Sequence, residues 1–393
     1  MDKRIVLGIT GGVAAYKACE LTRLCVKAGI EVDVVMTEAA THFVTPTTFQ
    51  ALSNRPVWTS PWDAREPKSM AHIELSRRAA GIVIVPASAN FMAKLVHGIA
   101  DDLLSTLCLA RQPGSPLLVA PAMNVEMWLQ TPTQRNVAQL REDGITVMGP
   151  GSGAQACGEV GDGRMLEPTQ IFGYIEALFV PKVLQGKRFV ITAGPTEEPI
   201  DPVRVITNTS SGKMGYSVAA AAAAAGAQVT LISGPTHLDT PAGVTKVSVK
   251  TAKDMFEAVK QAVTGADVFI AVAAVADYHV ANYSERKIKK DERHPGLTLE
   301  LEQNPDILAW AAQQKGLFSV GFAAESHDVL VNAEAKRKRK NIPLLVANKA
   351  QDAFGQDENE ITLIDDAGRH PLPRGTKADL ARQLIAHIAA RVK

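Results

Sequence analysis

The sequence has few cysteines for its length. Four stand among 393 residues, at Cys19, Cys25, Cys108 and Cys157. None forms a Cys-x-x-Cys pair, and no cysteine–histidine cluster has the spacing of a zinc site. A chain of this size does not need disulfide bonds to stabilise its core. We therefore expect reduced thiols and a cytoplasmic protein.

The sequence also lacks an excess of one charge and any long apolar run. Its formal net charge is +1, so no global field favours nucleic acid or an anionic membrane. No apolar run reaches the roughly 20 residues that span a bilayer. Residues 1–16 resemble a signal peptide in charge order, but Gly8, Gly11 and Gly12 interrupt the apolar stretch, which argues against a secretion signal. We expect a protein that binds neither nucleic acid nor membrane.

Short apolar runs alternate with helical patterns along the whole chain, which is typical of parallel α/β sheets. The predicted strands are 4–9, 31–36, 81–86, 116–120 and 145–148, then 188–192, 228–233, 267–272, 317–322 and 343–347, with a hairpin at 361–373. The predicted helices are 13–28, 89–96, 101–110, 131–142 and 168–179, then 214–225, 252–264, 328–340 and 377–392. We therefore predict an α/β protein of two doubly wound, Rossmann-like domains, 1–181 and 187–393.

Small polar residues follow the predicted strands of the first half, where ligands bind in open α/β sheets. Gly11 and Gly12 would let backbone N–H groups approach a phosphate, but a tight turn explains them equally well. Thr37, Ser88 and Asn90 can bind a ligand, or they can serve as helix N-caps, which favour the same residue types.

Three further residues have side chains suited to acid–base work or substrate binding. His72 opens a helical pattern after a polar segment, and the amide of Asn124 follows a strand. Cys157 lies in 149–165, a segment with six glycines and no apolar periodicity, which we predict to be a long loop. The alternatives are a solvated histidine and an inert cysteine.

The first half resembles the FMN-containing cysteine decarboxylases, and most closely phosphopantothenoylcysteine decarboxylase. The matching motifs are Gly11-Gly12 with Ala14-Ala15-Tyr16-Lys17, Pro86-Ala87-Ser88-Ala89-Asn90, Pro121-Ala122-Met123-Asn124, Ala156-Cys157-Gly158 and Gly163-Arg164-Met165. The resemblance implies His72 as the base, Asn124 as the holder of the substrate carboxylate, and Cys157 as a proton donor on a flap. It also implies FMN as cofactor, with contacts from Gly11, Gly12, Thr37, Ser88, Asn90 and Ser105.

The second half has polar and basic loops in comparable places. Its Ser/Gly-rich turn before Lys213 is not a Walker A loop, but it can bind phosphate or simply start a helix. Asp277 follows a strand and is a candidate Mg²⁺ ligand. The lysines of 287–290 and the basic run 336–340 suit a phosphate, although a solvated surface explains them too.

This half resembles phosphopantothenate–cysteine ligase. The matching motifs are Asp201-Pro202-Val203-Arg204, Asn208 with Ser210-Ser211-Gly212-Lys213-Met214-Gly215, Ala276-Asp277-Tyr278, Lys287-Ile288-Lys289-Lys290, Asn304-Pro305-Asp306-Ile307 and Gly321-Phe322-Ala323-Ala324-Glu325. The implied nucleotide contacts are Ala273, Ala274, Val275, Asp277, Lys287, Pro305, Asp306, Ile307, Leu308, Phe322, Lys336 and Lys340. Arg204 and Asn208 would handle the substrate carboxylate and its acyl-cytidylate, and Lys287 would help to convert that intermediate.

Together the two halves have the order of the bifunctional coenzyme A biosynthesis proteins of bacteria. The resemblance implies 4'-phosphopantothenate, L-cysteine and CTP as substrates, Mg²⁺ as a metal, and a homo-oligomer, a dodecamer. Two other classes of protein fit the sequence less well. A regulatory FMN-binding relative would lack His72 or Asn124, and a nicotinamide dehydrogenase would have a complete Gly-x-Gly-x-x-Gly turn.

Overall fold

The chain folds into two compact units, Met1–Val180 and Pro181–Lys393. The computed structural model describes residues 3–63, 70–156, 158–289, 296–325, 328–349 and 358–392. The candidate proton donor Cys157 and the last lysine of the 287–290 loop lie outside the described residues. Among the described helices, none has both the length and the apolar character needed to cross a bilayer.

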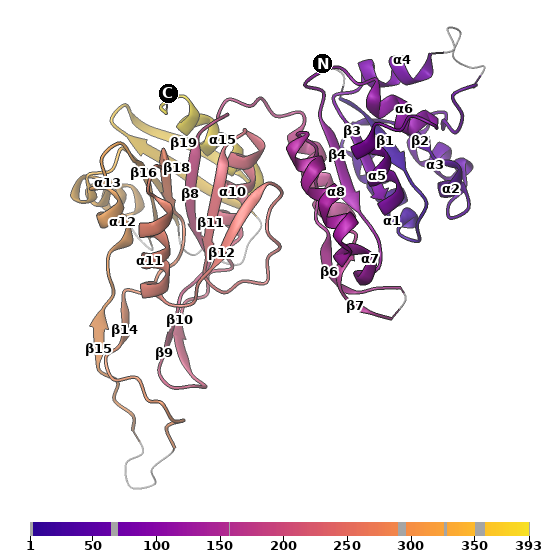
Figure 1. The fold of residues 1–393 in the computed structure, drawn as a ribbon. Helices are drawn as coiled ribbons and strands as arrows, with labels where there is room; N and C mark the ends of the chain where they lie inside the picture. The colour runs from indigo at the N-terminus through magenta and orange to yellow at the C-terminus, as the bar shows by residue number, and fades with distance from the viewer. Residues whose placement is uncertain are drawn as a thin grey trace. The chain divides into compact units, whose positions relative to one another are not determined.

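The first unit is built on a parallel sheet. Its strands are β1 (Arg4–Ile9), β2 (Glu31–Met36), β3 (Ile82–Ala87), β4 (Leu117–Pro121) and β5 (Thr146–Val147). They lie in the order β2-β1-β3-β4-β5 and all pair in parallel (Figure 1). The strands read as continuous apolar runs because helices cover both faces of the sheet.

Each face of this sheet has its own group of helices. The helices of the unit are α1 (Ala15–Lys27), α2 (Glu38–Thr41), α3 (Pro46–Ser53), α4 (Ala71–Arg78), α5 (Ala89–His97), α6 (Leu103–Leu109), α7 (Val125–Leu129), α8 (Thr131–Glu142) and α9 (Pro168–Ala177). Helices α1, α3 and α9 share one buried cluster with alternate residues of β1, such as Leu7. Helices α4, α5, α6 and α8 share the other, with Val6 and Ile84.

The segment predicted as a long loop forms a hairpin, so that prediction was wrong. Strands β6 (Gly151–Ala154) and β7 (Val160–Arg164) pair antiparallel as a separate ribbon. Glycine is unfavourable in strands and leaves no apolar alternation to read. The hairpin is instead held by hydrogen bonds to the segment after β4.

The second unit contains a larger, mixed sheet. Its strands are β8 (Arg188–Ala193), β11 (Gln228–Ser233), β12 (Val244–Ser248), β13 (Val268–Ala271), β16 (Phe318–Glu325), β17 (Leu344–Lys349), β18 (Glu358–Asp365) and β19 (Gly368–Thr376). The order is β12-β11-β8-β13-β16-β17-β18-β19. The first six strands are parallel and follow the sequence order 3-2-1-4-5-6, whereas β18 and β19 are antiparallel. The result is a Rossmann-type sheet extended by a hairpin.

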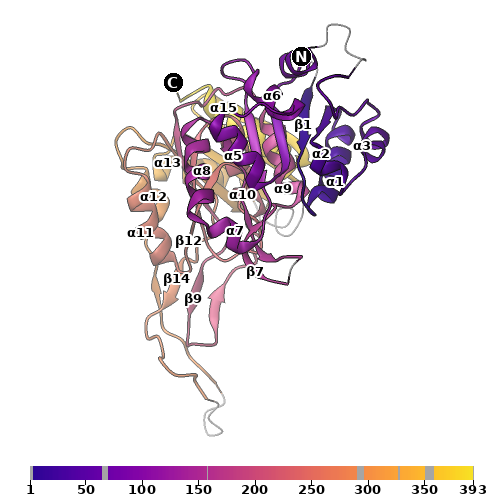
Figure 2. The same ribbon diagram turned by 45° about the vertical axis from the view of Figure 1, so that its right-hand side comes forward.

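Helices cover both faces of this sheet as well (Figure 2). They are α10 (Lys213–Ala224) and α15 (Lys377–Ala389), which pack together on one face, and α11 (Ala252–Ala262), α12 (Ile307–Ala311) and α13 (Val329–Lys340) on the other. The fold class predicted from the sequence is confirmed in both units.

Two short ribbons extend from the same end of the second unit, and neither was predicted. One consists of β9 (Glu197–Pro199) and β10 (Val205–Thr207), and the other of β14 (Tyr278–Val280) and β15 (Leu301–Gln303). Both views show them side by side, beyond the carboxyl ends of β8 and β13 (Figures 1 and 2).

Candidate active sites

In the first unit the strand order changes direction between β1 and β3, and ligands bind at such a switch point. Thr10 joins the two loops that leave these strands. Its hydroxyl donates to the carbonyl of Pro86 at 2.8 Å and accepts from the backbone N–H of Ser88 at 2.9 Å. The polar residues after β1 and β3 therefore meet at one crevice, as the sequence indicated.

The two glycines after β1 have different structural roles. A Cβ at Gly11 would lie 2.6 Å from the Cβ of Ala39, so this glycine permits close packing. A Cβ at Gly12 would meet no described atom within 4 Å. In the described structure, α1 has no side-chain cap and no acidic residue in its first turn. Open space at an uncapped helix N-terminus fits a phosphate group such as that of FMN.

The hydroxyl candidates of the first unit all serve as helix caps. Thr37 accepts from the N–H of Ala40 at the start of α2, and Ser88 accepts from that of Phe91 at the start of α5. Ser105 is buried and forms a capping box with Asp102 at the start of α6. Asn90, in contrast, is exposed beside Ser88. FMN contacts by these residues stay a prediction.

Asn124 lies against the β6–β7 hairpin. Its side chain caps α7 by accepting from the N–H of Met127 at 3.0 Å, while its amide donates to Glu126 at 2.6 Å and to Glu159 at 3.4 Å. Glu159 belongs to the turn of the hairpin. The structure thus brings two of the sequence motifs together, since the hairpin turn contacts the candidate carboxylate-binding residue.

Gln155 fixes the hairpin to the same segment. Its side-chain oxygen accepts from the N–H of Val125 at 3.1 Å, and its amide donates to the carbonyl of Asp162 at 3.1 Å. The N–H of Met123 donates to the carbonyl of Gly163 at 3.0 Å. A Cβ at Gly163 would lie 2.6 Å from the carbonyl oxygen of Met123, so only glycine permits this approach.

His72 is half-buried at the start of α4. In Figure 1, α4 and the β6–β7 hairpin lie at opposite ends of the first unit. A single chain therefore does not bring His72 to Asn124.

In the second unit the corresponding switch point lies between β8 and β13. The N–H of Ala274 donates to the carbonyl of Gly194 at 2.9 Å, and that of Thr196 donates to the carbonyl of Ala274 at 3.3 Å. The amide of Asn208 donates to the same carbonyl at 2.5 Å. The predicted substrate residue Asn208 is thus held against the predicted nucleotide segment 273–275.

Other predicted nucleotide residues converge beyond the same strand. Lys340 of α13 pairs with the carboxylate of Asp306, which caps α12. Burial lowers the pKa of Lys340, and the nearby charge of Asp277 opposes this effect. Lys336 donates to the carbonyl of Phe322 at 3.0 Å. Two cationic groups and the exposed carboxylate of Asp277 therefore lie at one edge of the sheet.

Arg204 and the lysine loop are joined through Asp201, whose structural role the sequence did not reveal. Hydrogen bonds from Arg204, and then from backbone N–H groups that include that of Ile288 at 3.1 Å, hold the pKa of the Asp201 carboxyl well below its usual range. Arg204 also donates to the carbonyl of Ile288 at 2.9 Å. The exposed Lys287 adjoins Ile288, so Asp201 positions both candidate residues.

The start of α10 has the features of an anion site. Gly212, in the left-handed region at φ +77°, precedes Lys213, and in the described structure α10 has no side-chain cap and no acidic residue in its first turn. A Cβ at Gly212 would lie 2.8 Å from the Cγ2 of Thr236.

Comparisons with known proteins agree with both halves. A family model described as Flavoprotein matches residues 1–180, and one described as DNA/pantothenate metabolism flavoprotein C-terminal domain matches 184–392. The coenzyme A biosynthesis bifunctional protein CoaBC of Vibrio cholerae is 48% identical over 388 residues, which cover 98% of this chain and 97% of that protein. The chain belongs to this bifunctional coenzyme A biosynthesis family.

A second relative gives the same result. The coenzyme A biosynthesis bifunctional protein of Escherichia coli K12 is 45% identical over 396 residues, covering 99% of this chain and 97% of that one. A solved C-terminal domain of a coenzyme A biosynthesis bifunctional protein is 41% identical and covers 53% of this chain and 97% of that domain, with a TM-score of 0.47. The family resemblance inferred from the motifs is confirmed, and the chain is a bifunctional enzyme with decarboxylase and ligase activities.

Proposed function

We propose that the second unit, 187–393, acts first and joins L-cysteine to 4'-phosphopantothenate at the expense of CTP. The first unit, 1–181, then decarboxylates the product, 4'-phospho-N-pantothenoylcysteine, to 4'-phosphopantetheine with FMN. The observation that carries this proposal is that residues of both motif sets, Ser88 in the first unit and Asn208 in the second, are held by hydrogen bonds at the switch points of their own sheets, where α/β proteins bind nucleotides.

FMN, when bound, supplies the reversible two-electron oxidation that makes loss of carbon dioxide from the substrate feasible. The open N-terminus of α1 would hold its phosphate. Asn124 would donate to the substrate carboxylate, which would replace one of its present contacts with Glu126 and Glu159. His72 would accept a proton from the substrate, and Cys157 would return one.

The placement of α4, which carries His72, at the end of the unit opposite the β6–β7 hairpin supports a site shared by two subunits. We propose a homo-oligomer, a dodecamer, in which α4 of one subunit faces the hairpin of another. The hairpin would then shield the reacting atoms from water.

In the second unit, Lys336 and Lys340 would neutralise the phosphates of CTP, and Asp277 would bind Mg²⁺ through its carboxylate oxygen. A carboxylate is a poor acyl donor, so the acid first forms an acyl-cytidylate and releases pyrophosphate. Asn208 and Arg204 would hold the carboxylate during this step, and Lys287 would neutralise the charge as the cysteine amine attacks.

The proposal is tested on purified protein in two separate assays. We expect bound FMN in the absorption spectrum, carbon dioxide release from 4'-phospho-N-pantothenoylcysteine, and pyrophosphate release that requires 4'-phosphopantothenate and is faster with CTP than with ATP. A flavin-free protein that cannot be reconstituted would refute the first assignment. A preference for ATP would refute the choice of nucleotide.

A further inference from the structure

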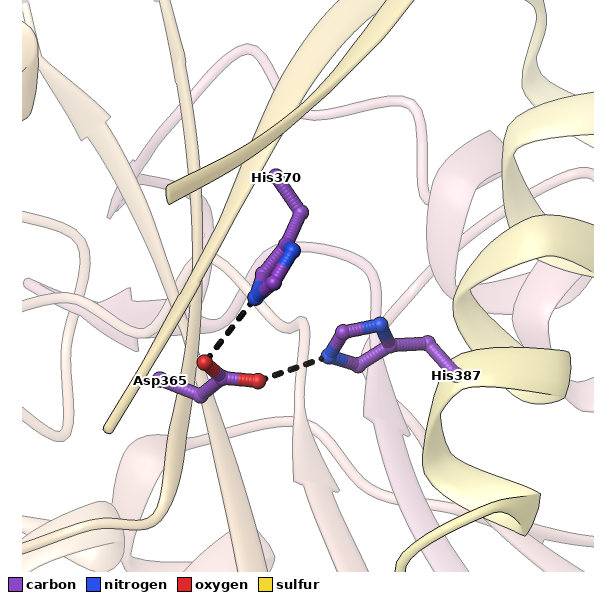
Figure 3. Close-up of side chains that lie close together, drawn as sticks. All are labelled: Asp365, His370 and His387. Carbon is purple, nitrogen blue, oxygen red and sulfur yellow. Dashed lines mark hydrogen bonds and ion pairs between the residues drawn. The ribbon is translucent and has the colours of Figure 1, made fainter. Parts of the chain in front are cut away.

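Two histidines and an aspartate converge in the second unit, away from the residues of the candidate ligase site (Figure 3). Asp365 ends β18, His370 lies on β19, and His387 lies on α15. The Nε2 of His370 is 3.0 Å from Oδ1 of Asp365, and the Nε2 of His387 is 2.9 Å from Oδ2. Figure 3 shows both rings directing this nitrogen at the carboxylate from different elements.

We propose that Asp365, His370 and His387 bind one Zn²⁺ ion. Two imidazoles and a carboxylate are ligands that zinc prefers. In a tetrahedral site with bonds of about 2.0–2.1 Å, neighbouring ligand atoms lie about 3.3 Å apart. The three ligand atoms here all lie within 4.8 Å of one another. Small rotations of the two rings would therefore suffice to place them around one ion.

The surroundings of the carboxylate suit a metal ligand. Oδ1 of Asp365 accepts from the N–H of Ala367 at 2.9 Å, and Oδ2 accepts from Arg391 at 2.5 Å. Arg391 can remain hydrogen-bonded to Oδ2 while Oδ1 coordinates the ion. Such hydrogen bonds from outside the ligand set orient ligating carboxylates. Asp365 is buried, whereas the side chain of His370 is 36% exposed, which leaves a path for the ion and for a water as fourth ligand.

The proposed zinc site is separate from the ligase site. β18 runs antiparallel to β17, with Ile364 opposite Leu345, so Asp365 lies at the amino end of the parallel strands. The nucleotide and substrate residues lie at their carboxyl ends. A zinc ion here would fasten α15 to the β18–β19 hairpin without touching the ligase substrates.

The test uses the full chain without a histidine tag, first stripped of metal by a chelator and then titrated with Zn²⁺ near pH 7.5, where unperturbed imidazoles are neutral. The variant is His370→Gln/His387→Gln, because a glutamine amide can still donate to Asp365. The matched control is His237→Gln, an exposed histidine of the same unit outside the cluster.

We expect wild type and the control to bind one more Zn²⁺ per chain than the double variant. At a hundred-fold excess of free Zn²⁺ over its dissociation constant, the unfolding midpoint of wild type should rise by about 5–10 °C. The double variant should lack this zinc-dependent rise. Equal zinc binding and equal shifts in all three proteins would overturn the proposal and leave a hydrogen-bonded cluster.

A second measurement covers the case in which the double variant fails to fold. X-ray absorption of zinc-loaded wild type should show two imidazoles and only nitrogen or oxygen around the ion. A sulfur ligand, or fewer than two imidazoles, would likewise overturn the proposal.

Discussion

Replacing Gln155 with alanine should loosen the β6–β7 hairpin of the decarboxylase unit. The substitution removes two hydrogen bonds, one from the N–H of Val125 and one to the carbonyl of Asp162. Each contributes about 1 kcal/mol net, but Asp162 belongs to the hairpin itself, so only the bond from Val125 holds the hairpin to the rest of the unit and its docking weakens by about 1 kcal/mol. This corresponds to a fall of roughly five-fold in the equilibrium constant between docked and undocked hairpin.

The assay is the rate of carbon dioxide release at saturating substrate, together with pyrophosphate release by the ligase unit. We expect the decarboxylase rate to fall by up to roughly five-fold and the ligase rate to stay unchanged. The control is Gln139→Ala, which removes one surface hydrogen bond from α8 to Asp143. A Gln155→Ala enzyme with wild-type decarboxylation would refute the idea that this side chain positions the hairpin.

Three other substitutions should each affect only one of the two units. His72→Asn should lower carbon dioxide release by about 10²–10⁴-fold and leave pyrophosphate release intact; parallel loss of both in folded protein would contradict the assignment. Asp201→Asn should release the Lys287 loop and lower ligase turnover on the order of 100-fold. The folded protein lowers the pKa of the Asp201 carboxyl, so the stabilisation from this carboxylate is complete above about pH 4, the pKa of an unfolded aspartate, and is lost only in stronger acid. A loss of the contact between Asp201 and the Lys287 loop in wild type near neutral pH would contradict this role. Gly234→Ala would place a Cβ 1.7 Å from the Pro195 carbonyl oxygen and should destabilise the second unit by about 3 kcal/mol. Thermal unfolding of the first unit, followed by flavin absorbance, should stay that of wild type.

The main sheets could be predicted because their strands are buried on both faces. Runs such as 4–9 and 81–86 are mostly apolar segments between turn residues, and the structure has strands over 4–9 and 82–87. The ribbons β9–β10 and β14–β15 could not be found in this way. They pair outside the main sheets, bury little apolar surface, and so have no hydrophobic period in the sequence.

The candidate sites could be predicted as sets of residues but not as arrangements. The sequence placed Ser88 and Asn208 after strands, and the structure links each to the neighbouring loop of its sheet. It could not show that the Ser105 side chain is buried in a capping box, because capping and ligand binding favour the same residue types. Nor could it show the role of Gln155, since a hydrogen bond to a distant backbone N–H leaves no periodic signal.

The outermost strand of the second unit also bears on how copies of this protein meet in concentrated solution. β19 ends the sheet, and an edge strand offers unpaired backbone groups to other chains. Pro371 and Pro373 occupy alternate positions of β19, so two N–H donors are missing from the same side of the strand. Arg369 and Arg374 of this strand are paired with Glu334 and Glu358, so they add no net charge to the edge. Two such edges could not form a continuous hydrogen-bond ladder, which protects the protein from aggregation through added strands.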